Sequence, residues 1–418
     1  MSYIQINGGI SLEGEIKIQG SKNAVLPIMA ASILNQGNVV IKGCPRIRDV
    51  DNMICLLKET GCNIRRDRDT LVIDTKEVRT GYLEERYAKT MRSSVFFIGA
   101  MLGRCGYVKI AYPGGCSIGK RPIDIHLDAL RKMNVEVIET DDGIVCQSRR
   151  LKGANITLPF PSVGATENII MAAVLADGIT ELSNGAKEPE IKELCAFLRK
   201  MGASIQCIKD GTYVIRGSQK LHDAEYKVGA DRIVAGTYLA ALAMTGGTGI
   251  LEADCGKSMG ATLCALQTCG CKGSYDERYI WIAAPKRVKA VPLIETKPFP
   301  GFPTDMQSQI IAVLSAAKGQ STVVENIFES RFESVKELRR LGANIVIQDR
   351  RACITGVEHL QGGIVEAKEL RGGAALVLAG LRAEGITKVY NICYVERGYE
   401  DICGNLSRLG ADIAYVEE

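Results

Sequence analysis

The sequence contains few of the residues that form metal sites, and it lacks long apolar runs. In 418 residues there are three histidines, one tryptophan and 15 cysteines, and no two cysteines form a Cys-x-x-Cys pair. Zinc sites use closely spaced cysteine and histidine ligands, so we expect no metal ion. No run of about 18 apolar residues occurs, which argues against a membrane-spanning helix.

The net charge is also small. Lys and Arg number 52 and Asp and Glu number 48, so the net charge of +4 gives no indication of a nucleic-acid partner. Residues 1–7 do not have the layout of a secretion signal, and 15 cysteines in such a chain indicate free thiols in the reducing cytoplasm. A chain of 418 residues is too long for one ordinary core, so two or more domains are expected.

The chain repeats itself six times. A pattern of the form Leu-x-x-x-Gly-small-x-Ile recurs at intervals of 68 to 73 residues, and three of its copies are looser. The copies begin at Leu57, Leu130, Leu198, Leu266, Leu338 and Leu406. Each copy is typical of a helix end, a glycine cap and a following strand. Six units of about 70 residues therefore fill the chain.

A second feature precedes each of these leucines by about 35 residues. It is an almost wholly apolar segment that opens on polar or charged residues. The six segments are 24–34, 95–102, 169–176, 233–244, 310–317 and 374–381. A helix that is apolar on all sides is buried on all sides, so the amphipathic helix and strands of each unit must surround it. We expect an α/β fold of two similar domains, each with three units around three buried helices.

Cations stand where three of these apolar segments begin, at Lys22, Arg92 and Arg371. Polar residues such as Thr166 and Asp305 at the equivalent places are ordinary first-turn residues. A cation at a helix N-terminus instead opposes the helix dipole. The three cations therefore favour anion binding over a purely structural role.

One cysteine differs from the others because its neighbours form loops. Residues 113–122 read Pro-Gly-Gly-Cys-Ser-Ile-Gly-Lys-Arg-Pro. The glycines let the chain bend and approach a ligand closely, and Lys120 and Arg121 would attract an anion and favour the thiolate of Cys116. Most cysteines are small core residues, whereas Cys116 is a candidate reactive thiol on a mobile lid.

Eight short stretches together resemble a known family. They are 20–23, 89–92, 114–122, 162–166, 188–190, 302–307, 328–332 and 396–400, and they include Gly-Ser-Lys-Asn, Glu-Pro-Glu, Phe-Pro-Thr-Asp-Met-Gln and Phe-Glu-Ser-Arg-Phe. These stretches cover all six units and are similar to those of the UDP-N-acetylglucosamine 1-carboxyvinyltransferases, which are enolpyruvyl transferases.

The resemblance implies an inside-out α/β barrel fold, with two similar domains that each contain three repeated βαβαββ-type units around buried helices. Residues 1–21 and 230–418 would form one domain, and residues 22–229 the other, which carries the Cys116 lid. The active site would lie between them. The resemblance also implies a cytoplasmic enzyme that needs no cofactor and has no nucleic-acid or membrane partner.

The family moves the enolpyruvyl group of phosphoenolpyruvate to the 3-hydroxyl of UDP-N-acetylglucosamine and releases phosphate. This is the first committed step of peptidoglycan precursor synthesis. Cations must hold the phosphate and the carboxylate, and acids and bases must move protons. By the resemblance, the phosphoenolpyruvate contacts correspond to Lys22, Asn23, Arg121 and Arg397, of which Lys22 and Arg397 also serve catalysis.

The sugar-nucleotide contacts follow from the same matches, with Arg92 as one of them. The uridine contacts correspond to Arg121, Pro122, Ile123, Asp124, Ile125, Ser162, Val163 and Gly164. Asp305 corresponds to the carboxylate that faces the sugar hydroxyl and acts as base. Ile327 corresponds to a backbone contact with the sugar nucleotide.

Four further residues complete the candidate site. Arg331 and Arg371 are expected to bind substrate, and Glu369 is expected to orient a phosphate-binding cation and to serve catalysis. Cys116 corresponds to the lid cysteine that forms a covalent adduct with phosphoenolpyruvate and is alkylated by the antibiotic fosfomycin. It acts either as an acid or in product release, and the sequence leaves this choice open.

Three positions depart from the family pattern. Glu369 and Glu396 stand where aspartate is usual, and Tyr394 stands where histidine is usual. Two alternative functions remain open at this point. One is a sister transferase with another acceptor, such as the shikimate-pathway enzyme, although the Cys116 lid argues against it. The other is a sugar-nucleotide binder without catalysis.

Overall fold

The computed structural model describes residues 2–79, 81–83, 85–89, 91–114, 122–218 and 220–417. Within these ranges the chain forms two compact units. The first unit contains residues from 2–19 and 230–417, and the second contains residues from 20–114 and 122–229. Ser21 lies in the second unit because its side chain caps the first buried helix and its N–H donates to the carbonyl of Gly229, at 2.9 Å.

Each unit contains three β-sheets among its described residues. The strands of the first unit are β1 (Tyr3–Asn7), β2 (Glu13–Lys17), β14 (Thr248–Glu252), β15 (Lys272–Tyr275), β16 (Tyr279–Ala283), β17 (Leu293–Glu295), β18 (Gln320–Val324), β19 (Asn344–Gln348), β20 (Arg351–Thr355), β21 (Ile364–Glu366), β22 (Ile386–Tyr390) and β23 (Asp412–Val416). Those of the second unit are β3 (Asn38–Lys42), β4 (Asn63–Asp67), β5 (Thr70–Asp74), β6 (Tyr107–Ile110), β7 (Glu136–Thr140), β8 (Gly143–Gln147), β9 (Asn155–Thr157), β10 (Ile179–Ser183), β11 (Ser204–Lys209), β12 (Thr212–Arg216) and β13 (Ala224–Lys227).

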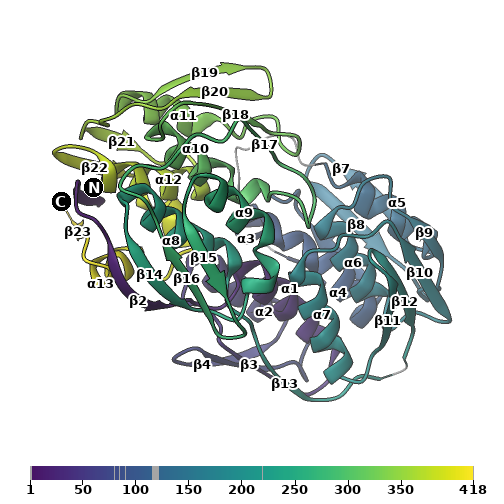
Figure 1. The fold of residues 1–418 in the computed structure, drawn as a ribbon. Coiled ribbons are helices and arrows are strands. Elements are labelled where there is room, and N and C mark those ends of the chain that lie inside the picture. The colour runs from purple at the N-terminus through teal and green to yellow at the C-terminus, as the bar shows by residue number, and fades with distance from the viewer. Residues whose placement is uncertain are drawn as a thin grey trace. The chain divides into compact units, whose positions relative to one another are not determined.

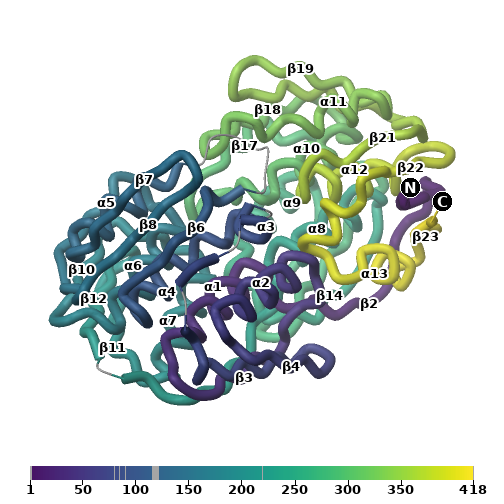
Figure 2. The backbone as a smooth tube through the Cα atoms, turned by 180° about the vertical axis from the view of Figure 1, so that it is seen from behind, coloured from purple at the N-terminus to yellow at the C-terminus, as the bar shows by residue number. Residues whose placement is uncertain are grey.

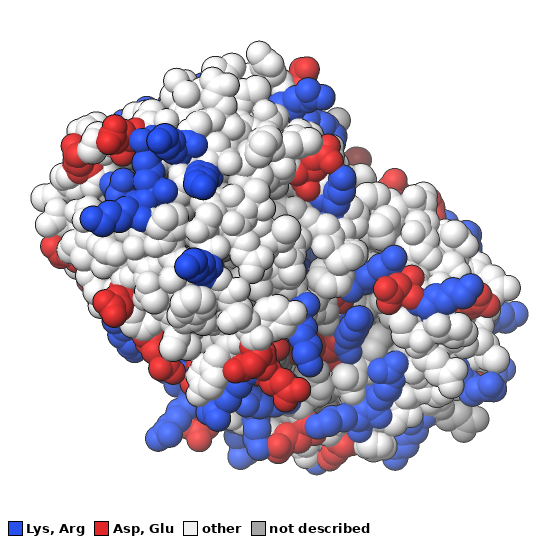
Figure 3. Space-filling model, viewed as in Figure 1, with Lys and Arg blue, Asp and Glu red and all other residues white. Residues whose placement is uncertain are grey.

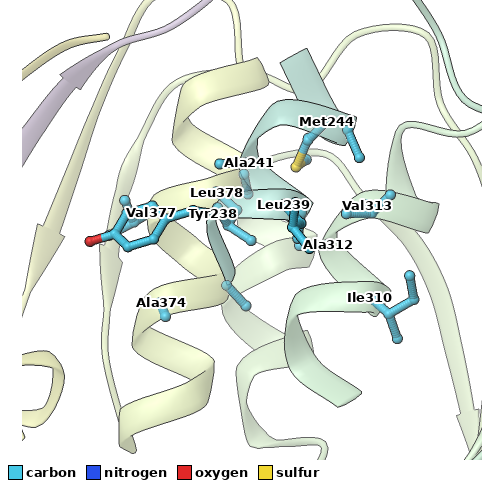
Figure 4. Packing of buried hydrophobic residues seen from close by; sticks show 14 of the residues in the cluster. Tyr238, Leu239, Ala241, Met244, Ile310, Ala312, Val313, Ala374, Val377 and Leu378 are labelled. Carbon is cyan, nitrogen blue, oxygen red and sulfur yellow. The ribbon is translucent and has the colours of Figure 1, made fainter. Parts of the chain in front are cut away.

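Three helices form the centre of each unit, as the apolar segments predicted. In the second unit they are α1 (Lys22–Ala31), α4 (Phe96–Cys105) and α6 (Val163–Ala173), and in the first unit α8 (Arg232–Thr245), α10 (Gln307–Ser315) and α12 (Leu370–Arg382). Figure 4 shows Leu239, Val313 and Leu378, one from each of the three central helices of the first unit, packed together. In the second unit Gly99 lets α4 approach α6 closely, because a Cβ there would lie 2.3 Å from the carbonyl oxygen of Asn168.

Six further helices, one for each repeat, complete the architecture, and each has both buried and exposed residues. They are α2 (Arg48–Glu59), α5 (Asp124–Lys132), α7 (Pro189–Lys200), α9 (Gly260–Thr268), α11 (Glu333–Arg340) and α13 (Ile402–Arg408). Their repeat leucines, Leu57 to Leu406, are at most 2% exposed. The glycine four positions later has a positive φ, for example 102° at Gly61, and in the second repeat Asn134 takes this place with a φ of 67°. A left-handed residue here ends each helix and starts the strand, so the repeat pattern is confirmed.

The order of strands repeats as well. In one sheet β17 pairs parallel with β18, β18 pairs antiparallel with β20, and β20 pairs antiparallel with β19. The chain therefore runs β17–α10–β18–α11–β19–β20, which is the expected βαβαββ unit. Within each unit, Figures 1 and 2 show the strands lying around the central helices.

Three strands complete sheets whose other strands lie far away in the sequence, and one of them is β2, which pairs in parallel with β14. In the first unit β1 lies between β22 and β23, so Ile4 pairs with both Val389 and Tyr415. The two chain ends therefore lie side by side, as Figures 1 and 2 show. In the second unit β13 pairs in parallel with β3. These long-range pairings close the ring of repeats within each unit.

The distribution of surface charge and the lengths of the apolar helices agree with the small net charge and the short apolar runs of the sequence. Figure 3 shows basic side chains interspersed with acidic ones on the face that it draws. Among the residues described, no helix has both the length and the apolar character needed to cross a membrane.

Candidate active site

Two buried arginines hold the carboxylate of Asp305. Asp305 lies in the 3-10 turn η4 (Thr304–Met306) that leads into α10. Its Oδ1 accepts from Nη2 of Arg331 at 2.7 Å, and its Oδ2 accepts from Nη2 of Arg371 at 3.3 Å. The arginine side chains are 2% and 4% exposed, whereas that of Asp305 is 29% exposed. The two cations favour the ionised carboxylate, which remains partly open to a ligand.

A polar network inside the core fixes Arg371. Burial alone would lower the pKa of its guanidinium, but the neighbouring Asp305, Tyr399 and Asp231, of which Tyr399 is also a hydrogen-bond partner, raise that pKa above the ordinary value. Burial raises the pKa of the Tyr399 hydroxyl, although the Arg371 cation opposes this shift. The Tyr399 hydroxyl lies 2.8 Å from Oγ1 of Thr237. Arg371 is therefore charged, and its hydrogen-bond partner Tyr399 links it to Thr237 of α8.

Glu369 acts in this structure as the N-cap of α12. Its carboxylate accepts from the backbone N–H of Arg371 at 2.7 Å and from that of Gly372. The residue is 5% exposed. A carboxylate at this place satisfies unpaired N–H groups and interacts favourably with the helix dipole. Glu369 thus fixes the backbone that carries Arg371.

We expect Glu369→Ala to lower both stability and activity. Loss of an N-cap costs about 0.5–2 kcal/mol in the free energy of unfolding, measured in denaturant. Activity should fall as well because the backbone of Arg371 loses its support. Asp401→Ala is the matched control, since Asp401 caps α13 of the same unit by accepting from Gly404 N–H at 2.7 Å. Equal losses of kcat in the two variants would show that Glu369 only stabilises its helix.

The other residues of interest in the first unit lie in the loop of Ile327 and in the 3-10 helix η5. The N–H of Ile327 donates to Oε1 of Glu325 at 2.8 Å. Arg397 ends the 3-10 helix η5 (Ile392–Arg397) and is half-buried. Glu396 is exposed, and Tyr394 is 36% exposed.

In the second unit, Lys22 begins α1 and already has a protein partner. Its Nζ lies 3.0 Å from Oδ2 of Asp49, and the two side chains are 13% and 2% exposed. Asn23 follows it and is half-buried. Asp49, like Asp305 beside Arg371, offsets the unfavourable interaction of a cation with a helix N-terminus. The position of these cations therefore does not by itself require a bound anion.

Arg92 contacts both flanks of the lid segment. It begins the 3-10 turn η2 (Arg92–Val95), and its guanidinium donates to the carbonyls of Pro113 and Pro122, each at 3.4 Å. The predicted reactive thiol is Cys116, and the two predicted lid cations are Lys120 and Arg121; all three lie outside the described residues.

The predicted uridine contacts lie at the N-termini of two neighbouring helices. Pro122 and Ile123 precede Asp124 and Ile125, the first residues of α5, whereas Ser162 caps α6, which begins with Val163 and Gly164.

His126 joins these two helix ends. A Cβ on Gly164 would lie 3.0 Å from its ring, and its Nδ1 lies 3.0 Å from Nδ2 of Asn168 on α6. The structure thus brings the residues of 122–125 and 162–164 together. The paired helix N-termini are suited to an anionic ligand.

Sequence reasoning missed three buried carboxyl groups. Asp49 pairs with Lys22, and Glu325 supports the loop of Ile327. Glu167 is 1% exposed, and burial, together with Glu190 and Glu188, raises its pKa well above the ordinary value. The partners of Asp49 and Glu325 are distant in the sequence or provided by loop backbone, and neither carboxylate oxygen of Glu167 has a hydrogen-bond partner among the described residues. No local pattern could therefore have identified these groups.

A protein-family model defines the class of this fold. Residues 6–406 match the family described as EPSP synthase (3-phosphoshikimate 1-carboxyvinyltransferase). Among solved structures, the enolpyruvyl transferase NikO from Streptomyces tendae aligns over 99% of both chains with a TM-score of 0.87 and 22% identity. EPSP synthase from Acinetobacter baumannii aligns over 100% of both chains with a TM-score of 0.74 and 17% identity. The chain has the enolpyruvyl transferase fold.

Curated relatives narrow the class further. The chain is 48% identical to UDP-N-acetylglucosamine 1-carboxyvinyltransferase 2 of Caldanaerobacter subterraneus subsp. tengcongensis, with all of both chains covered. It is 42% identical to the UDP-N-acetylglucosamine 1-carboxyvinyltransferase of Synechocystis sp., with 100% of this chain and 96% of the relative covered. The chain therefore belongs to the UDP-N-acetylglucosamine 1-carboxyvinyltransferase family.

Proposed function

We propose that this chain transfers the enolpyruvyl group of phosphoenolpyruvate to the 3-hydroxyl of UDP-N-acetylglucosamine and releases phosphate. This reaction would begin peptidoglycan precursor synthesis. The observation that carries the proposal is the full-length identity of 40–48% with relatives named for this transfer. The geometry around Asp305 supports a mechanism for it.

Asp305 is the proposed base. Its carboxylate takes the proton of the sugar 3-hydroxyl, whose oxygen bonds to C2 of phosphoenolpyruvate while the methylene carbon gains a proton. The resulting tetrahedral intermediate then loses phosphate as its C–O bond breaks, and a proton leaves the methyl group to restore the double bond. Arg331 and Arg371 hold the carboxylate in one orientation, which this kind of proton transfer requires.

The cations supply the charge that the substrates need. Nε of Arg331 and Nη1 of Arg371 are buried and have no hydrogen-bond partner among the described residues. Buried donors of this kind indicate a functional site. Lys22, Asn23, Arg121 and Arg397 are proposed to bind phosphoenolpyruvate, and Arg92, 121–125, 162–164 and Ile327 the sugar nucleotide.

The role of Cys116 and the cellular compartment are part of the same proposal. Cys116 would act as acid or in product release and would be the target of fosfomycin. The 14 described cysteines are all free, which supports a reducing compartment such as the cytoplasm.

A phosphate-release assay with two acceptors tests this function. We expect release with phosphoenolpyruvate and UDP-N-acetylglucosamine together, and none when 3-phosphoshikimate replaces the UDP-sugar. Release only with 3-phosphoshikimate would show a sister transferase. Calorimetric binding of UDP-N-acetylglucosamine without turnover would show a sugar-nucleotide binder.

A further inference from the structure

Glu325 is a fully buried acid that no step of the proposed reaction uses. It directly follows β18 and is 0% exposed. Taking a carboxyl group out of water is costly unless hydrogen bonds replace the lost solvent. A residue of this kind therefore needs several partners, and their identity shows what the carboxyl group holds in place.

Four donors surround the Glu325 carboxyl group. Oε1 accepts from the N–H of Ile327 at 2.8 Å, from the N–H of Phe328 at 3.1 Å and from Oγ1 of Thr296 at 2.9 Å. Oε2 accepts from Oγ1 of Thr304 at 3.0 Å. The two oxygens thus face different segments: Oε1 holds the loop of Ile327, and Oε2 holds the turn η4.

Both segments belong to the candidate site. Thr304 directly precedes Asp305 in η4, so its hydroxyl fixes the turn that carries the base. Thr296 also holds the loop of Ile327, because its Oγ1 accepts from the N–H of Asn326 at 2.9 Å and its carbonyl accepts from Nδ2 of Asn326 at 3.2 Å. One carboxyl group therefore links the base to the backbone that is expected to contact the sugar nucleotide.

We propose that Glu325 is a positioning residue that sets the place of Asp305 through Thr304 and the place of the Ile327 backbone through Thr296 and its own Oε1. The inference rests on the proposed function, since it assigns these two segments to base and acceptor. A displacement on the ångström scale can lower the rate of a positioned reaction by about 100-fold, so the link affects catalysis without touching substrate.

Removal of a single hydroxyl group tests each of the two links separately, the one through Thr304 and the one through Thr296. Thr304→Val removes the bond to Oε2 and should lower kcat about 10-fold or more, with the KM for UDP-N-acetylglucosamine changed less than about 2-fold. Thr296→Val loosens 326–328 and should raise that KM about 5-fold or more, with a smaller effect on kcat. Thr304→Ser and Thr296→Ser keep the hydroxyl groups and should restore wild-type values.

Thr387→Val is the matched control. Thr387 is 0% exposed on β22 of the same unit, and its Oγ1 has no hydrogen-bond partner among the described residues. This variant should leave kcat and KM unchanged. Denaturant unfolding of every variant measures any general loss of stability.

Two results would overturn the inference. One is a folded Thr304→Val variant with wild-type kcat, and the other is a loss of activity in Thr387→Val equal to those of the two test variants. Calorimetric affinity for UDP-N-acetylglucosamine provides a readout without turnover. If the wild type binds the UDP-sugar but releases no phosphate, the proposed function fails, while weaker binding by Thr296→Val than by Thr387→Val still supports the positioning of the loop.

Discussion

Asp305→Asn is expected to lower kcat for phosphate release by about 10²–10⁴-fold, the usual contribution of a general base. Asparagine keeps the size of the side chain but cannot accept the proton of the sugar hydroxyl. The KM for UDP-N-acetylglucosamine should change much less, because the amide can still contact the acceptor. Phosphate release at saturating concentrations of both substrates measures the effect.

Stability must be followed in the same variant. Asp305→Asn leaves two buried guanidinium groups without their carboxylate, and removal of one partner from such a set is destabilising. Unfolding in denaturant shows what fraction of the variant is folded under assay conditions. Asp412→Asn, on the exposed part of β23, is the control and should retain wild-type kcat. A folded Asp305→Asn variant with more than about a tenth of wild-type kcat would exclude Asp305 as the base.

Fosfomycin is expected to abolish activity by alkylating a single thiol, Cys116. The thiolate is the reactive form of cysteine, and the lid sequence places Lys120 and Arg121 close to Cys116 along the chain. Burial opposes reaction at other thiols: it raises the pKa of Cys62 and Cys271 to about 11, and that of Cys146, Cys195, Cys269 and Cys403 to about 12. These thiols stay protonated at neutral pH.

Mass spectrometry of the intact protein followed by peptide mapping checks this prediction. One adduct per chain should map to Cys116, and Cys116→Ala should show none. The exposed thiols Cys207, Cys264 and Cys393 are internal controls for general reactivity. Modification at those sites at the same rate would contradict a specially reactive lid cysteine.

The repeats and the buried helices could be predicted because both depend on local patterns. The spacing of leucine and glycine marks each helix end, and Asn134 preserves the left-handed conformation where glycine is missing. Three apolar segments begin differently from the expectation. The 3-10 turns η2 and η4 precede α4 and α10, and α6 begins at Val163, three residues before the expected start at Thr166. Local sequence therefore specifies where an element exists more reliably than where it starts.

The long-range partners could not be predicted. The insertion of β1 between β22 and β23 joins residues about 400 positions apart. The pairing of Lys22 with Asp49 and the four donors around Glu325 also depend on the folded chain. The cations Lys22 and Arg371 were correctly singled out at helix starts, but their carboxylate partners appear only in the structure.

Identification of the reaction product tests the central claim most directly. The protein is incubated with phosphoenolpyruvate and UDP-N-acetylglucosamine, and the sugar nucleotide is analysed by mass spectrometry and NMR while phosphate is measured. The account predicts one enolpyruvyl ether on the 3-oxygen of the sugar for each phosphate released. An unchanged UDP-sugar, or phosphate release without formation of that ether, would contradict it.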